Sequence, residues 1–167
     1  ERIKLNSVIL RSHNLQDVVP LVEFALERGL DISFIEEMPL GAVGHVRQDE
    51  FVASSELRAL IGSRYNLLPS DYKSGGPAAY WQVPGFSNQI GFISPHSANF
   101  CGSCNRVRVT AEGRLLLCLG NEHSVDLRAV LREAPEQLSA QIMAAMAIKP
   151  EQHHFDQPDE PQIVRFM

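Results

Sequence analysis

The chain has 167 residues, of which 44% are hydrophobic and 21% are charged, and its formal net charge is −5. This is the composition of one ordinary globular domain or two small ones, which excludes a disordered or collagen-like chain. The acidic balance argues against a nucleic-acid-binding surface, and no apolar run reaches the ~18 residues that span a bilayer. With no secretory leader in the sequence, we expect a cytoplasmic protein.

The first forty residues predict a strand, a helix and a second strand. Residues 3–10 are rich in aliphatic and β-branched side chains, and strand alternation places every second residue from Lys4 onward on one face. Asn14 stands where a helix N-cap is expected, and Gly29 suits the end of the same helix. Residues 31–38 predict the second strand. This order predicts a βαβ unit with parallel strands and a right-handed crossover.

Two parallel strands do not make a stable sheet by themselves. The first strand therefore needs a neighbour on its other side, or its edge stays bare. The chain also opens on Glu1 rather than on methionine. We therefore expect further strands to precede it in a longer protein.

Shorter elements are predicted beyond residue 40. Residues 40–52 predict a loop, and Ser54 or Ser55 is expected to cap a helix that runs to about Tyr65. The other predicted elements are a turn at 74–77, strands at 79–83 and 89–94, a hairpin of 106–110 and 114–119, helices at 125–132 and 135–147, and a loose tail containing Pro158 and Pro161.

The kind of element changes near residue 40, from a βα repeat to a meander with short helices. We therefore predict an α/β fold in two parts. Residues 1–40 form the βα part, and residues 41–167 form an α+β region with a small antiparallel sheet.

Three cysteines carry the strongest chemical signal. Cys101 and Cys104 form a Cys-x2-Cys pair, Cys118 follows after thirteen residues, and Gly102 lets the backbone turn tightly between the first two. The odd number argues against a disulfide framework, and such a pair with a distant third thiolate is typical of a metal centre. Cys118 alone would be interpreted as a small buried hydrophobic residue.

Several kinds of centre fit these cysteines. Structural zinc needs four protein ligands, and His123 or His96 is available as the fourth, so that spacing alone favours common structural zinc. An iron–sulfur cluster also takes thiolates, and with three of them a four-iron cluster keeps one iron open for a ligand. A thiol redox motif is the weakest alternative, because no helix start follows the first cysteine.

Two arginines follow the cysteine pair. Arg106 and Arg108 are two positions apart, so on a strand both side chains point the same way. Two guanidinium groups on one face beside a metal centre make an anion clamp for phosphates or carboxylates. The alternative is a solvated pair on an exposed strand face.

At this point the sequence resembles a known family. Residues 91–119, GFISPHSANFCGSCNRVRVTAEGRLLLCL, closely resemble the C-terminal cluster motif of the MoaA family, the radical S-adenosylmethionine GTP 3′,8-cyclases of molybdenum cofactor biosynthesis. The supporting matches are KLNSVIL at 4–10, FIEEMP at 34–39, GGPA at 75–78 and AIKP at 147–150.

The resemblance implies a fold and a reaction. The family fold is an incomplete TIM-type barrel of parallel βα units closed by a C-terminal region, and this chain resembles the last barrel strands with that region. In the family, an N-terminal Cys-x3-Cys-x2-Cys cluster cleaves S-adenosylmethionine to a radical that removes a hydrogen from the ribose of GTP. A second [4Fe–4S] cluster, held by three cysteines, binds the purine. Cyclic pyranopterin synthase then uses the product, (8S)-3′,8-cyclo-7,8-dihydroguanosine 5′-triphosphate.

The resemblance also assigns roles to single residues. The substrate-side cluster ligands are matched by Cys101, Cys104 and Cys118. The GTP-binding residues are matched by Lys4, Arg106, Val107 and Arg108. A methionine that packs at S-adenosylmethionine is matched by Met38.

Three departures from the family pattern stand out. The sequence lacks Cys-x3-Cys-x2-Cys, it has Ser33 where many members have arginine, and it lacks the family's Gly-Gly ending. We therefore expect the chain alone to be inactive as a cyclase, and to associate either with the N-terminal half of the enzyme or with itself.

Overall fold

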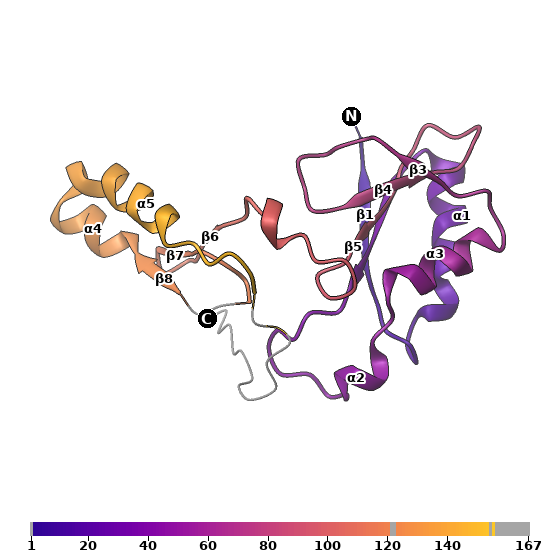
Figure 1. Ribbon diagram of the computed structural model, residues 1–167, viewed down its shortest axis with the longest axis horizontal. Coiled ribbons are helices and arrows are strands. Elements are labelled where there is room, and N and C mark those ends of the chain that lie inside the picture. The colour runs from indigo at the N-terminus through magenta and orange to yellow at the C-terminus, as the bar shows by residue number, and fades with distance from the viewer. Residues whose placement is uncertain (1, 121–122, 154, 156–167) are drawn as a thin grey trace. The chain divides into compact units, whose positions relative to one another are not determined.

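The computed structural model describes residues 2–120, 123–153 and 155, which form two compact units (Figure 1). Unit 1 is Glu1–Met38 with Gly44–Phe100, and unit 2 is Pro39–Val43 with Cys101–Met167. This grouping differs from the predicted division at residue 40. The reason is that a later strand of unit 1 pairs directly with the second strand of the chain, so the segment up to residue 100 completes the same sheet.

The βαβ unit at the start of unit 1 is confirmed. Strand β1 runs parallel to β2, in a register that extends from Lys4 opposite Asp31 to Ile9 opposite Glu36. Helix α1 ends at Gly29, whose φ of 63° is left-handed and suits glycine. The elements are β1 (Lys4–Ile9), the 3₁₀ turn η1 (Leu15–Asp17), α1 (Val18–Arg28) and β2 (Asp31–Glu36).

The rest of unit 1 completes a five-stranded mixed sheet. Its order is β1-β2-β5-β4-β3, with β5 parallel to β2 and with β3 and β4 antiparallel to their neighbours. The additional elements are α2 (Arg47–Glu50), α3 (Ser54–Gly62), β3 (Leu68–Ser70), β4 (Ala79–Gln82) and β5 (Ile90–Ile93). The predicted strands β4 and β5 are confirmed, whereas α2 lies in a predicted loop and β3 was not predicted.

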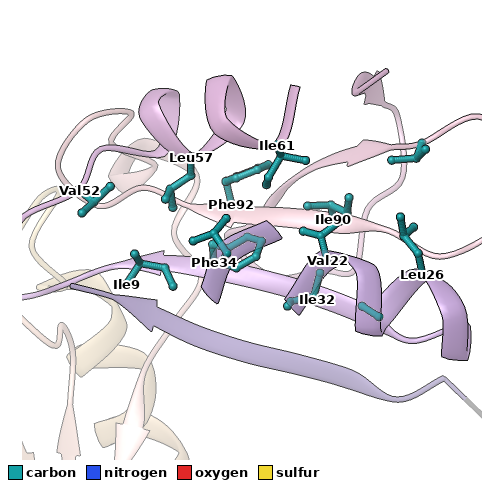
Figure 2. Close-up of a cluster of buried hydrophobic side chains, with 13 residues drawn as sticks. Ile9, Val22, Leu26, Ile32, Phe34, Val52, Leu57, Ile61, Ile90 and Phe92 are labelled. Atoms are coloured by element: carbon teal, nitrogen blue, oxygen red, sulfur yellow. The ribbon is translucent and has the colours of Figure 1, made fainter. Parts of the chain in front are cut away.

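One face of this sheet is covered by two helices. Helices α1 and α3 pack against each other and against β2 (Figure 1). Figure 2 shows side chains from both helices meeting side chains of β2 and β5, including Phe34 and Phe92, whose ring centroids are 6.0 Å apart. The buried cluster consists of Ile9, Val18, Val22, Ala25, Leu26, Ile32, Phe34, Val52, Leu57, Ile61, Val83, Ile90 and Phe92.

Two helix caps predicted from the sequence are wrong. The Asn14 side chain accepts a hydrogen bond from Leu10 N (2.8 Å) and donates one to Val8 O (2.9 Å), so it holds the end of β1 rather than capping a helix. The side chain of Ser54 makes no capping bond, and its Oγ pairs with Ser94 Oγ at 2.7 Å. Asn14 thus binds backbone groups that precede it, and Ser54 contacts a residue 40 positions away, which helix spacing cannot reveal.

Unit 2 is a three-stranded antiparallel sheet followed by two helices. The sheet order is β6-β7-β8, which confirms the predicted hairpin. Its elements are the 3₁₀ turn η2 (Cys101–Ser103), β6 (Arg108–Val109), β7 (Arg114–Leu116), β8 (Ser124–Asp126), α4 (Leu127–Glu133), the 3₁₀ turn η3 (Pro135–Gln137) and α5 (Leu138–Ala147). The buried apolar residues of unit 2 are Leu115, Leu117 and Ala145.

The predicted helix at 125–132 begins two residues too early. Val125 belongs to β8 and lies opposite Leu115 of β7. Asp126 then caps α4, since its Oδ1 accepts a hydrogen bond from Ala129 N at 2.9 Å. The tail predicted around Pro158 and Pro161 lies outside the described residues. Among the helices that the structure describes, none combines the length and apolar character needed to cross a membrane.

Candidate functional site

The three predicted metal-ligating cysteines lie in unit 2. Cys101 opens η2, and Cys104 closes that turn by donating its backbone N–H to Cys101 O at 3.0 Å. Cys118 follows the end of β7. All three lie within the described residues, all are partly buried, and none forms a disulfide. A tight turn and the end of a hairpin strand therefore supply the thiols.

Three thiols are donors that two kinds of metal centre take. Zinc needs four ligands around one point, with sulfur distances of about 2.3 Å, whereas an iron–sulfur cluster spreads its thiolates over different irons. Within residues 2–120, 123–153 and 155, no three His, Cys, Asp or Glu side chains are grouped closely enough to hold a metal ion, and this applies to the three cysteines as well as to His123.

The paired arginines lie on the solvent side of the hairpin. Arg106 and Val107 precede β6, and Arg108 begins that strand opposite Leu116. All three of these residues are exposed. The hairpin turn is set by Gly113, which has a φ of 80° and donates its N–H to Thr110 O at 2.9 Å. The hairpin therefore links the arginine strand to the strand that leads to Cys118.

The remaining predicted site residues lie in unit 1. Lys4 is exposed on β1, where its Nζ donates a hydrogen bond to Tyr80 Oη at 3.2 Å. Met38 is half-buried just after β2. Ser33 is fully buried on β2, and its Oγ has no hydrogen-bond partner in the described structure. Lys4 and Ser33 share the sheet face opposite the helices, as strand alternation predicts.

The sequence analysis missed Glu36, a buried carboxylate at the end of β2. Its side chain is 1% exposed. Oε1 accepts the Ser54 N–H at the start of α3 (2.9 Å), and Oε2 accepts the N–H groups of His96 (3.1 Å) and Ser97 (3.0 Å). The Ser97 hydroxyl also donates to Oε1. The available signal was an acidic residue in phase with the buried Phe34 on a two-residue period.

These hydrogen-bond donors determine whether the carboxyl group of Glu36 is ionised. Burial alone raises the pKa of the carboxyl, but the hydrogen bonds from the Ser97 hydroxyl and from three backbone N–H groups favour the ionised form. The net result is a pKa below the ordinary carboxyl value. Glu36 is therefore negatively charged, and its hydrogen bonds link β2 to the start of α3 and to the segment that follows β5.

Polar side chains also gather where the parallel strands end. Glu37 Oε1 lies 2.8 Å from His45 Nε2, and the ring of His45 lies 6.1 Å from that of His13. His96 Nε2 lies 3.0 Å from the Glu37 carbonyl oxygen, so this imidazole joins the same group of polar residues in unit 1. The carboxyl edge of parallel strands is where open α/β sheets bind ligands.

Comparison with known proteins gives consistent results. The sequence pattern of the family described as Molybdenum Cofactor Synthesis C matches residues 30–155. The chain is 56% identical over 171 residues to a GTP 3′,8-cyclase of Saccharophagus degradans, covering 100% of this chain and 52% of that protein. The corresponding values for GTP 3′,8-cyclase 2 of Pseudomonas aeruginosa are 54%, 100% and 52%. The chain thus spans about half the length of the curated relatives it matches.

Proposed function

The chain belongs to the Molybdenum Cofactor Synthesis C family, and we propose that it is the C-terminal part of a GTP 3′,8-cyclase acting in molybdenum cofactor biosynthesis. In this proposal unit 1 supplies the last βα elements of an incomplete barrel. The parallel order β1-β2-β5 and the helix-covered face support it. Unit 2 supplies the substrate-side cluster ligands and part of the GTP site.

The observation that carries the proposal is the Cys-x2-Cys pair followed by Cys118, in a chain that is 56% identical to a GTP 3′,8-cyclase. Cys101, Cys104 and Cys118 would hold a [4Fe–4S] cluster, which in this role binds the purine of GTP through an iron that lacks a protein ligand. Arg108 begins the hairpin strand next to the strand that leads to Cys118, Arg106 lies two residues before that strand, and both arginines are exposed. Guanidinium groups bind phosphate oxygens through charge-assisted hydrogen bonds. These arginines and the Val107 backbone bind the triphosphate.

Two residues of unit 1 complete the assignment. The Lys4 ammonium adds a further contact to GTP, and Met38 packs against S-adenosylmethionine. The sequence holds three cysteines, and all of them are assigned to the substrate-side cluster. The cluster that cleaves S-adenosylmethionine therefore needs cysteines from outside this chain, so the chain by itself does not carry out the radical reaction.

Anaerobic reconstitution with iron and sulfide tests the cluster assignment. We expect about four irons per chain in the wild type and a loss of cluster absorption in Cys101→Ser, Cys104→Ser and Cys118→Ser. Ser103→Ala, in the same turn but without a ligand atom, is the matched control and keeps the iron. Stoichiometric zinc that is lost on His123→Ala would instead establish the Cys3His alternative.

Nucleotide binding tests the arginine clamp. Replacing Arg106 or Arg108 by alanine is expected to weaken GTP binding by about 1.5–3 kcal/mol each, because each side chain makes a charge-assisted contact. Isothermal titration calorimetry of the reconstituted protein measures this loss, and the iron content stays unchanged because neither arginine is a ligand. Wild-type affinity in both variants would exclude the clamp.

Association tests the partner assignment. We propose that the chain pairs with a segment carrying the N-terminal half of the enzyme, or with itself, through the edge of β1. In the described structure β1 has β2 as its strand neighbour, so its other edge presents backbone donors and acceptors. Size-exclusion chromatography with light scattering is expected to show dimers or larger species. A clean monomer at high concentration would contradict self-association.

A further inference from the structure

The sheet face opposite α1 and α3 carries a row of residues that crosses four strands. Asn6 of β1 lies opposite Ser33 of β2, Ser33 opposite Gly91 of β5, and Gly91 opposite Tyr80 of β4. Lys4 stands two residues before Asn6, so its side chain projects from the same face.

In the middle of this row the side chains project little above the sheet, because the residues there are small. Ser33 is fully buried, and Gly91 has no side chain. A Cβ at position 91 would overlap Ser33 Oγ and would come within 3.0 Å of Tyr80 Cε1. The serine hydroxyl and the tyrosine ring therefore both lie over Gly91. Because the residues in the middle of the row are small, the side chains of Lys4 and Tyr80 can extend toward each other over β2 and β5 and meet.

Tyr80 holds the end of that lysine. Lys4 Nζ donates to Tyr80 Oη at 3.2 Å and lies 5.7 Å from the ring centroid. The phenol in turn donates to Ser74 Oγ at 2.8 Å, and Tyr72 packs edge-on against the ring with centroids 5.0 Å apart. Tyr80 itself is 3% exposed. A flexible side chain is thus fixed by a buried and rigid group.

The contact with Tyr80 leaves other donors of Lys4 available. Its strand neighbour Asp31 accepts the Gln89 N–H at 2.7 Å and pairs with Arg2 at 3.4 Å. An ammonium group has three N–H donors, and the hydrogen bond to the phenol uses one of them. Lys4 therefore has donors left for an anion.

We propose that Tyr80 is a positioning residue, which holds the Lys4 ammonium on the sheet face opposite α1 and α3 as a preorganised contact for a phosphate group of the substrate. The inference rests on the proposed function, in which Lys4 binds GTP, and adds the residue through which Lys4 is placed. A preorganised cation loses less side-chain freedom on binding than a mobile lysine does. Tyr80 acts on the ligand through Lys4 and not by direct contact.

A double-mutant cycle tests this dependence. Dissociation constants for GTP and for inorganic tripolyphosphate are measured by isothermal titration calorimetry in wild type, Tyr80→Phe, Lys4→Met and the double variant. We expect Tyr80→Phe to weaken binding of both probes about fivefold to tenfold, and to have no effect in the Lys4→Met background. Tyr65→Phe, which removes a phenol hydroxyl that pairs with Glu23, is the matched control and leaves both constants unchanged.

The outcomes separate this inference from the proposed function. Tripolyphosphate binding that depends on both residues, without GTP binding, supports the positioned cation and contradicts GTP as the ligand. GTP binding with equal losses on Tyr80→Phe in the presence and absence of Lys4 overturns the positioning role and leaves the cyclase assignment intact. If neither probe binds the wild-type protein, the inference is overturned. The proposed function is then still tested independently by the iron content after reconstitution.

Discussion

The two units of the chain differ in what holds them together. Unit 1 buries a large apolar cluster between a five-stranded sheet and two helices. Among the described residues of unit 2, the buried apolar cluster consists of Leu115, Leu117 and Ala145, with Val125 and Leu127 packed against it. Unit 2 nevertheless carries all three cysteines and both arginines of the candidate site. A small core gives little folding free energy, so small domains rely on metals or cross-links. We infer that unit 1 is stabilised mainly by its core, and that the cluster proposed for unit 2 would add to the stability of that unit.

The largest expected effect comes from opening the core of unit 1. Phe34→Ala removes a fully buried ring that packs against Phe92, which is expected to cost about 3–5 kcal/mol. Urea unfolding followed by the fluorescence of Trp81, the single tryptophan, measures the loss. Phe86→Ala, at a ring that is 43% exposed, is the control with a small effect. Hydrogen exchange in α4 and α5 should not change. A parallel loss of protection there would show that the two units unfold together.

A smaller loss is expected from the buried carboxylate. Glu36→Gln keeps the shape but places an amide among donors, at a cost of about 3 kcal/mol in unit 1. The pKa of Glu36 is lowered in the folded state, so its contribution is present above the ordinary carboxyl pKa and is lost as the pH falls through the lowered value. Urea midpoints measured between about pH 3 and pH 7 should therefore fall on acidification more steeply in wild type than in Glu36→Gln. Glu27→Gln, at an exposed site on α1, is the control. Equal slopes would show that Glu36 is not ionised.

The smallest of these effects concerns the hairpin of unit 2. Gly113→Ala forces a side chain onto a φ of 80° and brings its Cβ within 2.6 Å of Arg128 Cβ. We expect a loss of about 2 kcal/mol confined to unit 2, seen as faster hydrogen exchange in β7 and α4 with an unchanged Trp81 transition. Gly102→Ala is the control, because a Cβ there meets no atom within 4 Å. An unchanged exchange rate in Gly113→Ala would show that the hairpin turn is not a fixed feature of unit 2.

Much of this fold could be predicted because strand alternation, helix ends and tight turns depend on residues that are close together in the sequence. The alternation of residues 3–10, the glycine after α1 and the Glu112–Gly113 hairpin are all confirmed. Strand β3 was missed because it has three residues and includes Pro69, which does not look like a strand. Helix α2 was missed because a single turn has no periodicity.

The site was harder to predict than the elements. The Cys-x2-Cys spacing predicts a metal centre, but spacing alone does not choose between zinc and an iron–sulfur cluster, and the metal centre stays a prediction. The roles of Glu36 and Tyr80 depend on partners from distant segments. Tyr80 meets Lys4 across 76 residues, and no single-sequence pattern brings those positions together. The prediction of an incomplete barrel remains a proposal, while the mixed sheet is what the described residues form.

The hydrogen bonds of Glu36 also set the order in which the chain can reach its final state. Its donors at Ser54, His96 and Ser97 lie 18, 60 and 61 residues further along. Closing loops of that length lowers the conformational entropy of the chain before the new contacts stabilise it. These hydrogen bonds therefore form late in folding. During synthesis Glu36 leaves the ribosome before these donors do, so its carboxylate stays hydrated until Ser97 has been added and its hydrogen bonds can form. Substitutions at Glu36 should accordingly accelerate unfolding while leaving the folding rate nearly unchanged.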